Sequence, residues 1–282
     1  MIKFILGGLG NWYEDYPLTE KAVIEADKYD FEGIIFPDHY MWGELPWHKR
    51  PDSNKTLDTW MTISYLLAKT EKIKIGTLVT PIPFRPPGML AKMISTADVL
   101  SGGRTMVGIG AGWSQIEFEG YSEWNGPKVR VDKTYEGLDL MIQLWTKDKV
   151  NFEGKYYNAR GAILDPKPLQ KPYPKLIFGS RGKRMLKLAG QYADICFIPP
   201  WPGSDPDEIK QIVTDEARLY KRTDKIKFMG GSMEPTEVEN YPPKIEQAIN
   251  SGADYFLVSF QRTPEVTDTL KKFAEETIPS FR

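Results

Sequence analysis

The chain has 282 residues, of which 41% are hydrophobic and 27% are charged, so it can bury one large core and suits either two small domains or one α/β barrel. Its 37 basic and 38 acidic residues give a net charge of −1, which excludes the positive field that nucleic acids and anionic membranes select. One cysteine excludes an internal disulfide, and two histidines without a cysteine cluster argue against a structural zinc site.

The start of the chain gives no sign of export. Residues 1–8 contain too short an apolar run, with the wrong flanks, for a signal peptide, and no later stretch approaches the length of a membrane span. We therefore expect a cytoplasmic protein with neither a membrane nor a nucleic acid as partner. Cys196 lies inside an apolar run and is expected to be buried filler.

Strand-like apolar runs alternate with amphipathic helix patterns along the whole chain. The expected strands are residues 3–6, 33–36, 73–79, 105–109, 175–178, 195–198, 225–229 and 255–260. The expected helices are residues 19–29, 57–67, 86–97, 135–145, 185–192 and 205–217, with further patterns around 245–249 and 266–273. Eight strands, each followed by a helix, predict one α/β domain, a closed (β/α)8 TIM barrel; a doubly wound open sheet is the alternative fold.

Residues 150–174 break this alternation with scattered glycines and prolines. We expect an insertion between units four and five of the barrel, either a lid or hairpin over the barrel mouth or a solvated surface excursion. Two helix starts are more sharply defined. Pro87 suits the first turn of a helix, and Asp205 before Pro206 is expected to be an N-cap.

The fourth strand runs into alternating glycines, in the order Gly108-Ile-Gly110-Ala-Gly112-Trp113. The spacing differs from the G-x-G-x-x-G dinucleotide fingerprint, and no helix pattern starts on the third glycine, so a nicotinamide-type Rossmann site is disfavoured. The glycines are expected either to let a ligand approach the backbone or to form a tight turn. The polar stretch from Trp113 to Asp132 is too long for an ordinary connection and is predicted to belong to the site.

In such a barrel the site is built from residues that follow the carboxyl ends of the strands. The candidates are Asp38, His39 and Trp42 after the second strand, Leu78, Val79 and Thr80 at the end of the third, Ala111, Gly112 and Trp113 after the fourth, Gly179, Ser180, Arg181 and Gly182 after the fifth, and Trp201 after the sixth. The tryptophans suggest a flat apolar slot for a ring system, although each alone is explained by packing. A histidine at a strand end is either catalytic or structural.

The run Gly179-Ser-Arg-Gly-Lys-Arg184 joins a strand to the start of a helix. Free backbone N–H groups and the positive end of the helix dipole accept a phosphate at such a place, and Arg181 or Lys183 can add charge. The alternative is a capped turn with solvated basic side chains.

Four stretches of the chain carry a family resemblance. They are Asp38-His-Tyr-Met-Trp42 and residues 75–86, 100–113 and 176–194. Together they resemble the bacterial luciferase-like monooxygenase family, and within it the branch that uses the deazaflavin coenzyme F420. The resemblance implies a barrel whose mouth holds a flavin or deazaflavin ring, with Asp38 and His39 beside the ring and the phosphate on the loop after the fifth strand.

The resemblance has further implications. Members of the family often have a non-proline cis peptide after the third strand, which by position would be Leu78–Val79. The sugar-phosphate dehydrogenases of the family have a glutamate near the position of Trp113, so that substrate class is in doubt. The family tendency is a homodimer, and the apolar helices around Trp60 and Leu90 would face either a second copy or the barrel.

These observations predict an oxidoreductase that transfers a hydride between bound F420 and a small organic molecule, with His39 stabilising the charge that develops on the ring. One alternative is an FMN-dependent monooxygenase that uses oxygen. A second is a flavin-binding protein without turnover, because a fold does not fix a function. No metal is expected, and Arg50 and Arg160 are expected to be solvated.

Overall fold

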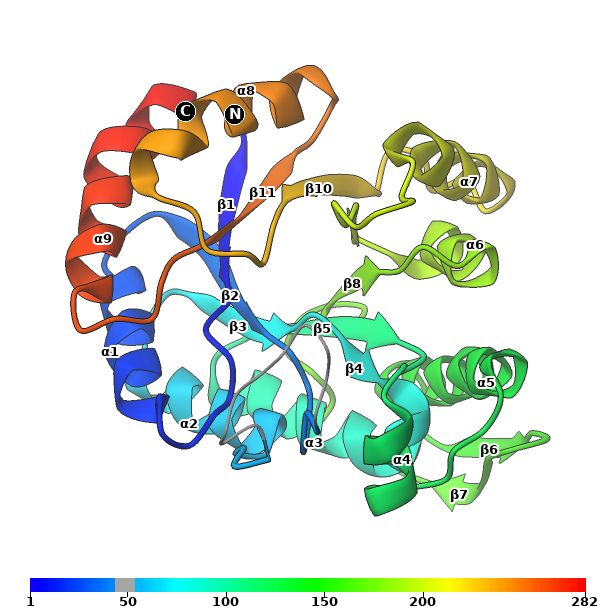
Figure 1. Cartoon of the computed structure of the whole chain (residues 1–282). Coiled ribbons are helices and arrows are strands. Elements are labelled where there is room, and N and C mark those ends of the chain that lie inside the picture. The colour runs from blue at the N-terminus through cyan, green and yellow to red at the C-terminus, as the bar shows by residue number, and fades with distance from the viewer. Residues whose placement is uncertain (44–53) are drawn as a thin grey trace.

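The computed structural model describes residues 1–43 and 54–282. Parallel strands form a barrel at the centre, and helices surround it (Figure 1). The strands of the main sheet are β1 Lys3–Gly7, β2 Phe31–Phe36, β3 Lys74–Thr77, β4 Thr80–Pro81, β5 Thr105–Gly110, β8 Lys175–Gly179, β9 Ile195–Phe197, β10 Lys227–Gly231 and β11 Tyr255–Ser259. The sheet closes because β3 pairs with β5 as well as with β2, which confirms the (β/α)8 barrel.

The third barrel strand is divided in two. β3 and β4 both pair with β5, and the Leu78–Val79 peptide between them is cis, as the family resemblance implied. The other predicted strands occur within two residues of their expected bounds. The largest shifts are of two residues: β2 begins two residues before its expected start, and β10 begins two residues after its expected start, with Ile226 buried just before it.

The main helices are α1 Tyr16–Ala26, α2 Thr59–Lys69, α3 Pro87–Leu100, α4 Gln115–Tyr121, α5 Pro127–Thr146, α6 Lys183–Tyr192, α7 Pro206–Leu219, α8 Tyr241–Asn250 and α9 Val266–Lys272. Short helical turns cover 82–84, 238–240 and 273–281. The predicted starts are confirmed: Pro87 opens α3, and the Asp205 carboxylate accepts from the N–H groups of Asp207 and Glu208. In the part of the chain that the structure describes, no helix combines the length and apolar composition that a membrane span needs.

Alternating residues of the strands build two cores. In β1, Phe4 and Leu6 face the helices, whereas Ile5 faces the barrel interior and packs in a cluster with Leu78, Met106, Ile177, Phe197 and Leu257. This is the period of two expected for a strand buried on both faces. Cys196 belongs to the outer core and is fully buried, as predicted, and its burial raises the pKa of the thiol to about 12.

The insertion is an antiparallel hairpin of β6 Val150–Glu153 and β7 Asn158–Ala162. Its turn is fixed to α5, where the Glu136 carboxylate accepts from the N–H groups of residues 155, 156 and 157. Together with α3 and α5 the hairpin borders a cavity of about 610 Å³ on the outer side of the barrel. The hairpin therefore packs against α5 and lies beside α3. Arg160 is exposed as expected, and Arg50 lies outside the described residues.

Candidate active site

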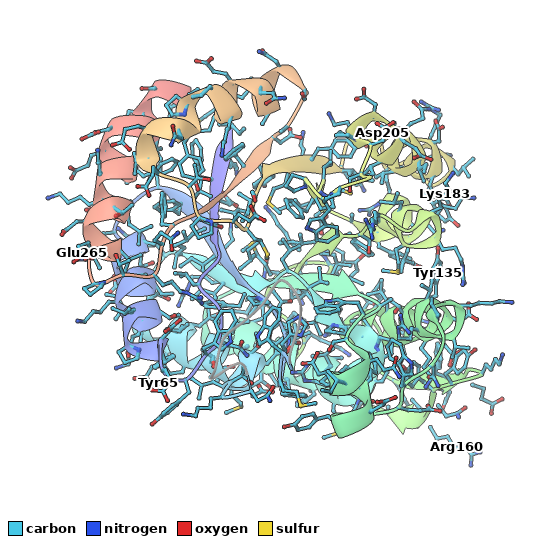
Figure 2. All side chains as sticks on the ribbon, viewed as in Figure 1. Tyr65, Tyr135, Arg160, Lys183, Asp205 and Glu265 are labelled. Carbon is cyan, nitrogen blue, oxygen red and sulfur yellow. The ribbon has the colours of Figure 1, made fainter. Side chains whose placement is uncertain are left out.

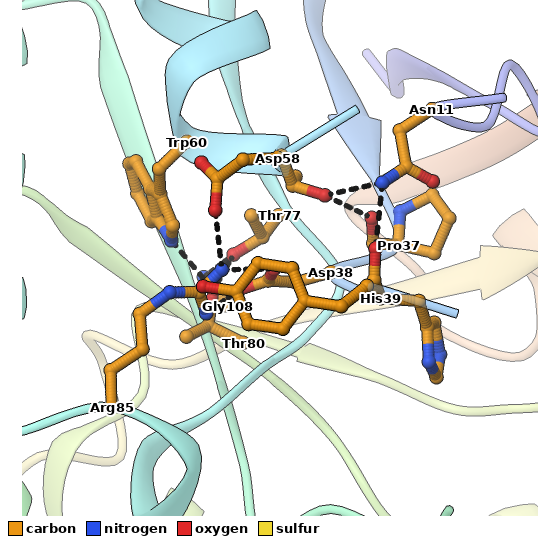
Figure 3. A network of polar contacts seen from close by, with 12 residues as sticks. Asn11, Pro37, Asp38, His39, Asp58, Trp60, Thr77, Thr80, Arg85 and Gly108 are labelled. Carbon is orange, nitrogen blue, oxygen red and sulfur yellow. Dashed lines mark hydrogen bonds and ion pairs between the residues drawn. The ribbon is translucent and has the colours of Figure 1, made fainter. Parts of the chain in front are cut away.

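Loops at the carboxyl ends of β1 and β2 hold one another in place. The side-chain amide of Asn11, which follows β1, donates to the carbonyl oxygen of His39 at 2.8 Å. The same nitrogen donates to the carbonyl of Leu57 and to the hydroxyl of Thr59, at the start of α2. Figure 3 shows Asn11 directed at the loop that carries His39. Because these three acceptors belong to the loop that carries His39 and to the helix that follows it, one buried amide fixes the position of the His39 backbone.

Asp38 lies in a buried ion pair. Both of its carboxylate oxygens accept from Arg85, at 2.6 and 2.8 Å, and Arg85 also donates to Asp58 at 3.2 Å. Burial alone would lower the pKa of Arg85, but the charges of Asp38 and Asp58 raise it. The guanidinium lies 4.7 Å from the ring centre of Tyr40, whose burial raises its pKa to about 12.

This geometry separates the roles of Asp38 and His39. Asp38 is only 1% exposed, and the imidazole of His39 points away from the Asp38–Arg85 pair (Figure 3). The family resemblance implied that both residues lie beside the ring. The Asp38 carboxylate is turned toward Arg85, so it orients the loop that presents His39.

The imidazole of His39 pairs with an acid that the sequence analysis did not identify. Nδ1 of His39 lies 2.8 Å from Oε2 of Glu117, and both side chains are almost entirely buried. The other oxygen of Glu117 accepts from the N–H groups of Tyr40 and Met41. Glu117 therefore joins α4, which follows β5, to the loop that follows β2.

Aromatic rings surround this histidine. The ring centres of His39 and Trp42 lie 4.0 Å apart, and that of Trp113 lies 5.6 Å from His39 with the rings near edge-on. Trp42 stacks on Trp12, which follows β1, at 5.4 Å. Trp113 is 47% exposed. The structure thus brings together His39, Trp42 and Trp113, as predicted from their places at strand ends.

The residues at the end of the third strand lie in the interior and in the wall of the barrel. Leu78 and Val79 pack in the inner barrel cluster. Thr80 is fully buried: its hydroxyl accepts from the indole N–H of Trp60 at 3.0 Å and is 3.0 Å from the hydroxyl of Thr77. Thr77 in turn accepts from the N–H of Gly108 (Figure 3). The Thr80 side chain is therefore part of the barrel wall and not of its open end.

The glycines at the end of β5 and just after it lie in close contact with neighbouring residues. A Cβ on Gly108 would overlap the carbonyl of Thr77, one on Gly110 would overlap the side chain of Val79, and one on Gly112 would overlap the ring of Phe118. Gly112 also has φ +77°, a conformation that favours glycine. The close approach that these glycines permit is therefore by neighbouring protein, and Ala111 beside them is partly buried in the core.

The loop after β8 leads into a helix start without a side-chain cap. Gly182 is the N-cap of α6 and has no side-chain cap, so the first N–H groups of the helix are not satisfied by a side chain. A Cβ on Gly182 would meet nothing within 4 Å. Arg181 donates to the carbonyl of Pro202, which ties the loop to the one after β9, and Lys183 pairs with Glu208. Gly179 lies against the side chain of Leu78. Ser180, the residue between Gly179 and Arg181, is partly exposed.

Glu117 and Arg85 are two site residues that the sequence analysis did not identify, and only Glu117 carries a local sequence signal. Ser114-Gln-Ile-Glu117 is the S-x-x-E signature of a capping box, and α4 does start at Gln115. Arg85 had no such signal, because its pairing with Asp38 joins positions far apart in the sequence. Among residues 1–43 and 54–282, no group of His, Cys, Asp and Glu side chains could hold a metal ion.

A closed parallel barrel with an aromatic, histidine-bearing mouth defines a (β/α)8-barrel protein with a site suited to a planar ring. The model of the luciferase-like monooxygenase family matches residues 13–232, and the chain belongs to this family. The sequence resemblance is thereby confirmed.

Curated relatives include proteins that use either cofactor. The chain is 33% identical over 157 residues to the FMNH2-dependent dimethylsulfone monooxygenase of Pseudomonas putida, which covers 55% of this chain and 42% of that protein. It is 32% identical over 211 residues to the F420-dependent glucose-6-phosphate dehydrogenase of Amycolatopsis mediterranei, which covers 73% of this chain and 60% of that protein. The chain thus spans about half the length of the curated relatives that it matches.

Solved structures agree on the fold. An F420-dependent secondary alcohol dehydrogenase in complex with an F420-acetone adduct has a TM-score of 0.83 at 22% identity, with 100% of both chains covered. The coenzyme F420-dependent tetrahydromethanopterin reductase of Methanopyrus kandleri has a TM-score of 0.76 at 18% identity, with 100% of this chain and 99% of that chain covered. At these identities the likeness establishes the barrel architecture.

Proposed function

We propose that this protein is an oxidoreductase that transfers a hydride between bound F420 and a small organic molecule. The observation that carries the proposal is the buried His39–Glu117 pair, at the end of β2 and beside Trp42 and Trp113. An ionisable ring held by a buried carboxylate within an aromatic enclosure is suited to balancing charge or moving a proton next to a planar cofactor.

The residues present fit such a cofactor. Leu78 and Val79 supply an apolar surface in the inner barrel cluster, and Trp42 and Trp113 present flat rings beside His39. The uncapped start of α6, with open space at Gly182, would hold the phosphate. When bound there, the deazaflavin would supply hydride chemistry, whereas the protein supplies orientation and electrostatics.

The class of substrate is inferred from the exposed ring of Trp113. It stands about half exposed near His39, and Ile116 on the following helix is also exposed. An apolar rim favours a substrate with an apolar body over a sugar phosphate. We therefore expect small alcohols or carbonyl compounds to be better substrates than glucose 6-phosphate.

The second candidate is an FMN-dependent monooxygenase that uses oxygen, which the likeness to the Pseudomonas putida enzyme favours. The third is a flavin-binding protein without turnover.

A titration combined with a turnover assay separates these proposals. The purified protein is titrated with F420 and with FMN, and binding is followed by quenching of Trp42 and Trp113 fluorescence. We expect micromolar or tighter binding of F420, and its reduction by a member of a panel of secondary alcohols. Binding of FMN alone would overturn the cofactor assignment, and binding without any turnover would favour the third candidate.

We also propose that the protein acts in the cytoplasm as a homodimer. Trp60 and Leu90 are fully buried and face the barrel, so they do not form the interface. The outer faces of α2 and α3 instead expose Met61, Tyr65 and Met89, and Tyr65 lies at the edge of the molecule (Figure 2). Exposed apolar side chains on two adjacent helices suit an isologous contact. A light-scattering mass near twice 32.2 kDa would support this interface.

A further inference from the structure

Glu117 is a buried carboxylate with both oxygens directed at one loop. Oε1 accepts from the backbone N–H groups of Tyr40 and Met41, and Oε2 lies 2.8 Å from Nδ1 of His39. Its side chain is 3% exposed. A buried carboxylate requires such compensation, since an unpaired charge in the interior is strongly destabilising.

The contacts of Glu117 differ from those that would stabilise the start of its own helix, α4. In a capping box the serine hydroxyl bonds to the start of the helix, and the glutamate reaches back to the N–H of that serine. Here the Ser114 hydroxyl makes no cap hydrogen bond and is buried without a hydrogen-bond partner among the described residues. The capping box is therefore left unformed while Glu117 reaches the loop after β2. Local helix stability does not explain where this carboxylate is placed.

The hydrogen-bond pattern, with Glu117 as an ionised carboxylate, implies which nitrogen of neutral His39 carries the proton. Backbone N–H groups can only donate, so Oε1 of Glu117 acts as an acceptor toward both of them. An ionised carboxylate can only accept, and Nδ1 of His39 must then donate to Oε2. In the neutral imidazole the other nitrogen, Nε2, is consequently without a proton.

We propose that Glu117 is a positioning residue that keeps the proton of neutral His39 on Nδ1 and so presents Nε2 as an acceptor at the barrel mouth. The inference rests on the proposed function, in which His39 acts beside the cofactor ring. Its logic is that of a buried acid that sets the tautomer and orientation of a histidine, as in the serine protease triad. Glu117 acts through His39 and does not itself touch the reacting atoms.

The decisive variant is Glu117→Gln. A glutamine side chain can accept from Tyr40 and Met41 through its oxygen and donate to Nδ1 of His39 through its amide. The neutral ring must then carry its proton on Nε2, so the substitution inverts the tautomer with almost no change in shape. Glu119→Gln is the matched control, because Glu119 lies on the same helix, loses the same charge and is exposed, with Gln115 as its hydrogen-bond partner.

The measurement uses the fact that the chain has two histidines, His39 and His48. In a His48→Gln parent, long-range proton–nitrogen correlation spectra of the ¹⁵N-labelled protein report His39 alone, at a pH where the ring is neutral. We expect the Nδ1–H pattern in the parent and in the Glu119→Gln control, and the Nε2–H pattern in Glu117→Gln. The Nε2–H pattern in the parent, or an unchanged pattern in a folded Glu117→Gln variant, would overturn the inference.

The parent spectrum tests the proposal even if Glu117→Gln does not fold. Titration of the same His48→Gln parent with F420 distinguishes a failure of the role given to Glu117 from a failure of the proposed function. A parent that binds F420 but carries its proton on Nε2 contradicts the role of Glu117 alone. A parent with the Nδ1–H tautomer that binds neither F420 nor FMN contradicts the proposed function and supports the assignment of the proton.

Discussion

Arg85 donates to both carboxylate oxygens of Asp38, from Nη1 to Oδ2 at 2.6 Å and from Nη2 to Oδ1 at 2.8 Å. Both side chains are buried, and bidentate pairing of this kind fixes orientation as well as charge. Since Asp38 directly precedes His39, the pair sets where the imidazole leaves the end of β2. The ion pair is thus a support for the site.

Replacement of Asp38 by alanine should therefore lower stability. The variant leaves the buried Arg85 with Asp58, at 3.2 Å, as its remaining carboxylate partner among the described residues, and the loss of one member of a buried ion pair costs about 3–5 kcal/mol. Chemical denaturation measures the loss. Arg218→Ala is the control, because it removes a largely exposed ion pair with Asp215 and should cost less than about 1 kcal/mol. Equal stability of the two variants would contradict the supporting role.

Acid should weaken the contact between α1 and the turn before β3. The Asp27 carboxylate accepts from the N–H groups of Glu71, Lys72 and Ile73. Burial alone would raise the pKa of Asp27, but these three donors and the charge of Arg104 outweigh it and lower the pKa. A lowered pKa in the folded state contributes stability above the unfolded pKa of about 3.9, and that stability is lost as the pH falls through the folded value.

The expected result is that Asp27→Asn lowers the free energy of unfolding at pH 7 and makes it fall less steeply below about pH 4. Unfolding by urea at a series of pH values checks this, with Asp224→Asn as a control at an exposed carboxyl group. Parallel pH curves for the wild type and Asp27→Asn would show that the three N–H contacts do not depend on the charge of Asp27.

The barrel could be predicted from sequence because its signal is local. Strands buried on both faces read as short apolar runs, and each is followed by an amphipathic helix. The start of β10 was misplaced because Ile226 is buried outside the strand. The sequence pattern places α4 within a polar loop, because this helix has only seven residues and begins shortly after the glycine run.

The site could be predicted only in part. His39, Trp42 and Trp113 were found because strand ends converge at one end of a barrel. Contacts such as Asp38 with Arg85 and His39 with Glu117 depend on which side chains meet across that end, which no local pattern encodes. The glycine run 108–112 was expected either to let a ligand approach or to form a tight turn, and a Cβ on these glycines would meet the neighbouring strand or the Phe118 ring.

Gly108→Ala tests the structural role of these glycines. A methyl group there would overlap the backbone carbonyl of Thr77, which cannot move as a side-chain tip can. Overpacking of this kind costs about 1–3 kcal/mol or more, and thermal unfolding would show it as a lower midpoint. Gly182→Ala is the matched control, because a Cβ there meets nothing within 4 Å. A midpoint for Gly108→Ala equal to that of the control would mean that β3 and β5 are less closely packed than described.

Gly182→Val tests the proposed phosphate position. Gly182 has φ −74° and ψ 126°, which a β-branched residue can adopt, and the space beside it is open. The melting temperature of the ligand-free protein should thus be nearly unchanged. If a phosphate approaches the start of α6, the bulky side chain should weaken F420 binding about tenfold or more, or about 1.4 kcal/mol. Unaltered affinity in the titration would remove the loop after β8 from the cofactor site.

His39 is the residue on which the catalytic proposal depends. Its imidazole lies between Glu117 and the rings of Trp42 and Trp113, so its removal should leave most of the surface that binds the cofactor intact. We therefore expect His39→Ala to retain F420 affinity within a few-fold. Turnover of the panel substrate should fall about 100-fold or more, because a positioned acid–base group typically contributes about 10²–10⁴-fold.

A second variant, His39→Gln, separates the loss of the imidazole from a loss of stability. His39→Ala leaves the buried Glu117 without its side-chain partner, whereas the amide of His39→Gln can still donate to that carboxylate. Both variants lack the imidazole, so both should lose turnover even if only His39→Ala is less stable. Fluorescence titration and the rate of deazaflavin reduction are measured on the same preparations. Full activity in His39→Gln would show that the imidazole has no chemical role, and loss of F420 binding in both variants would make His39 a binding residue instead.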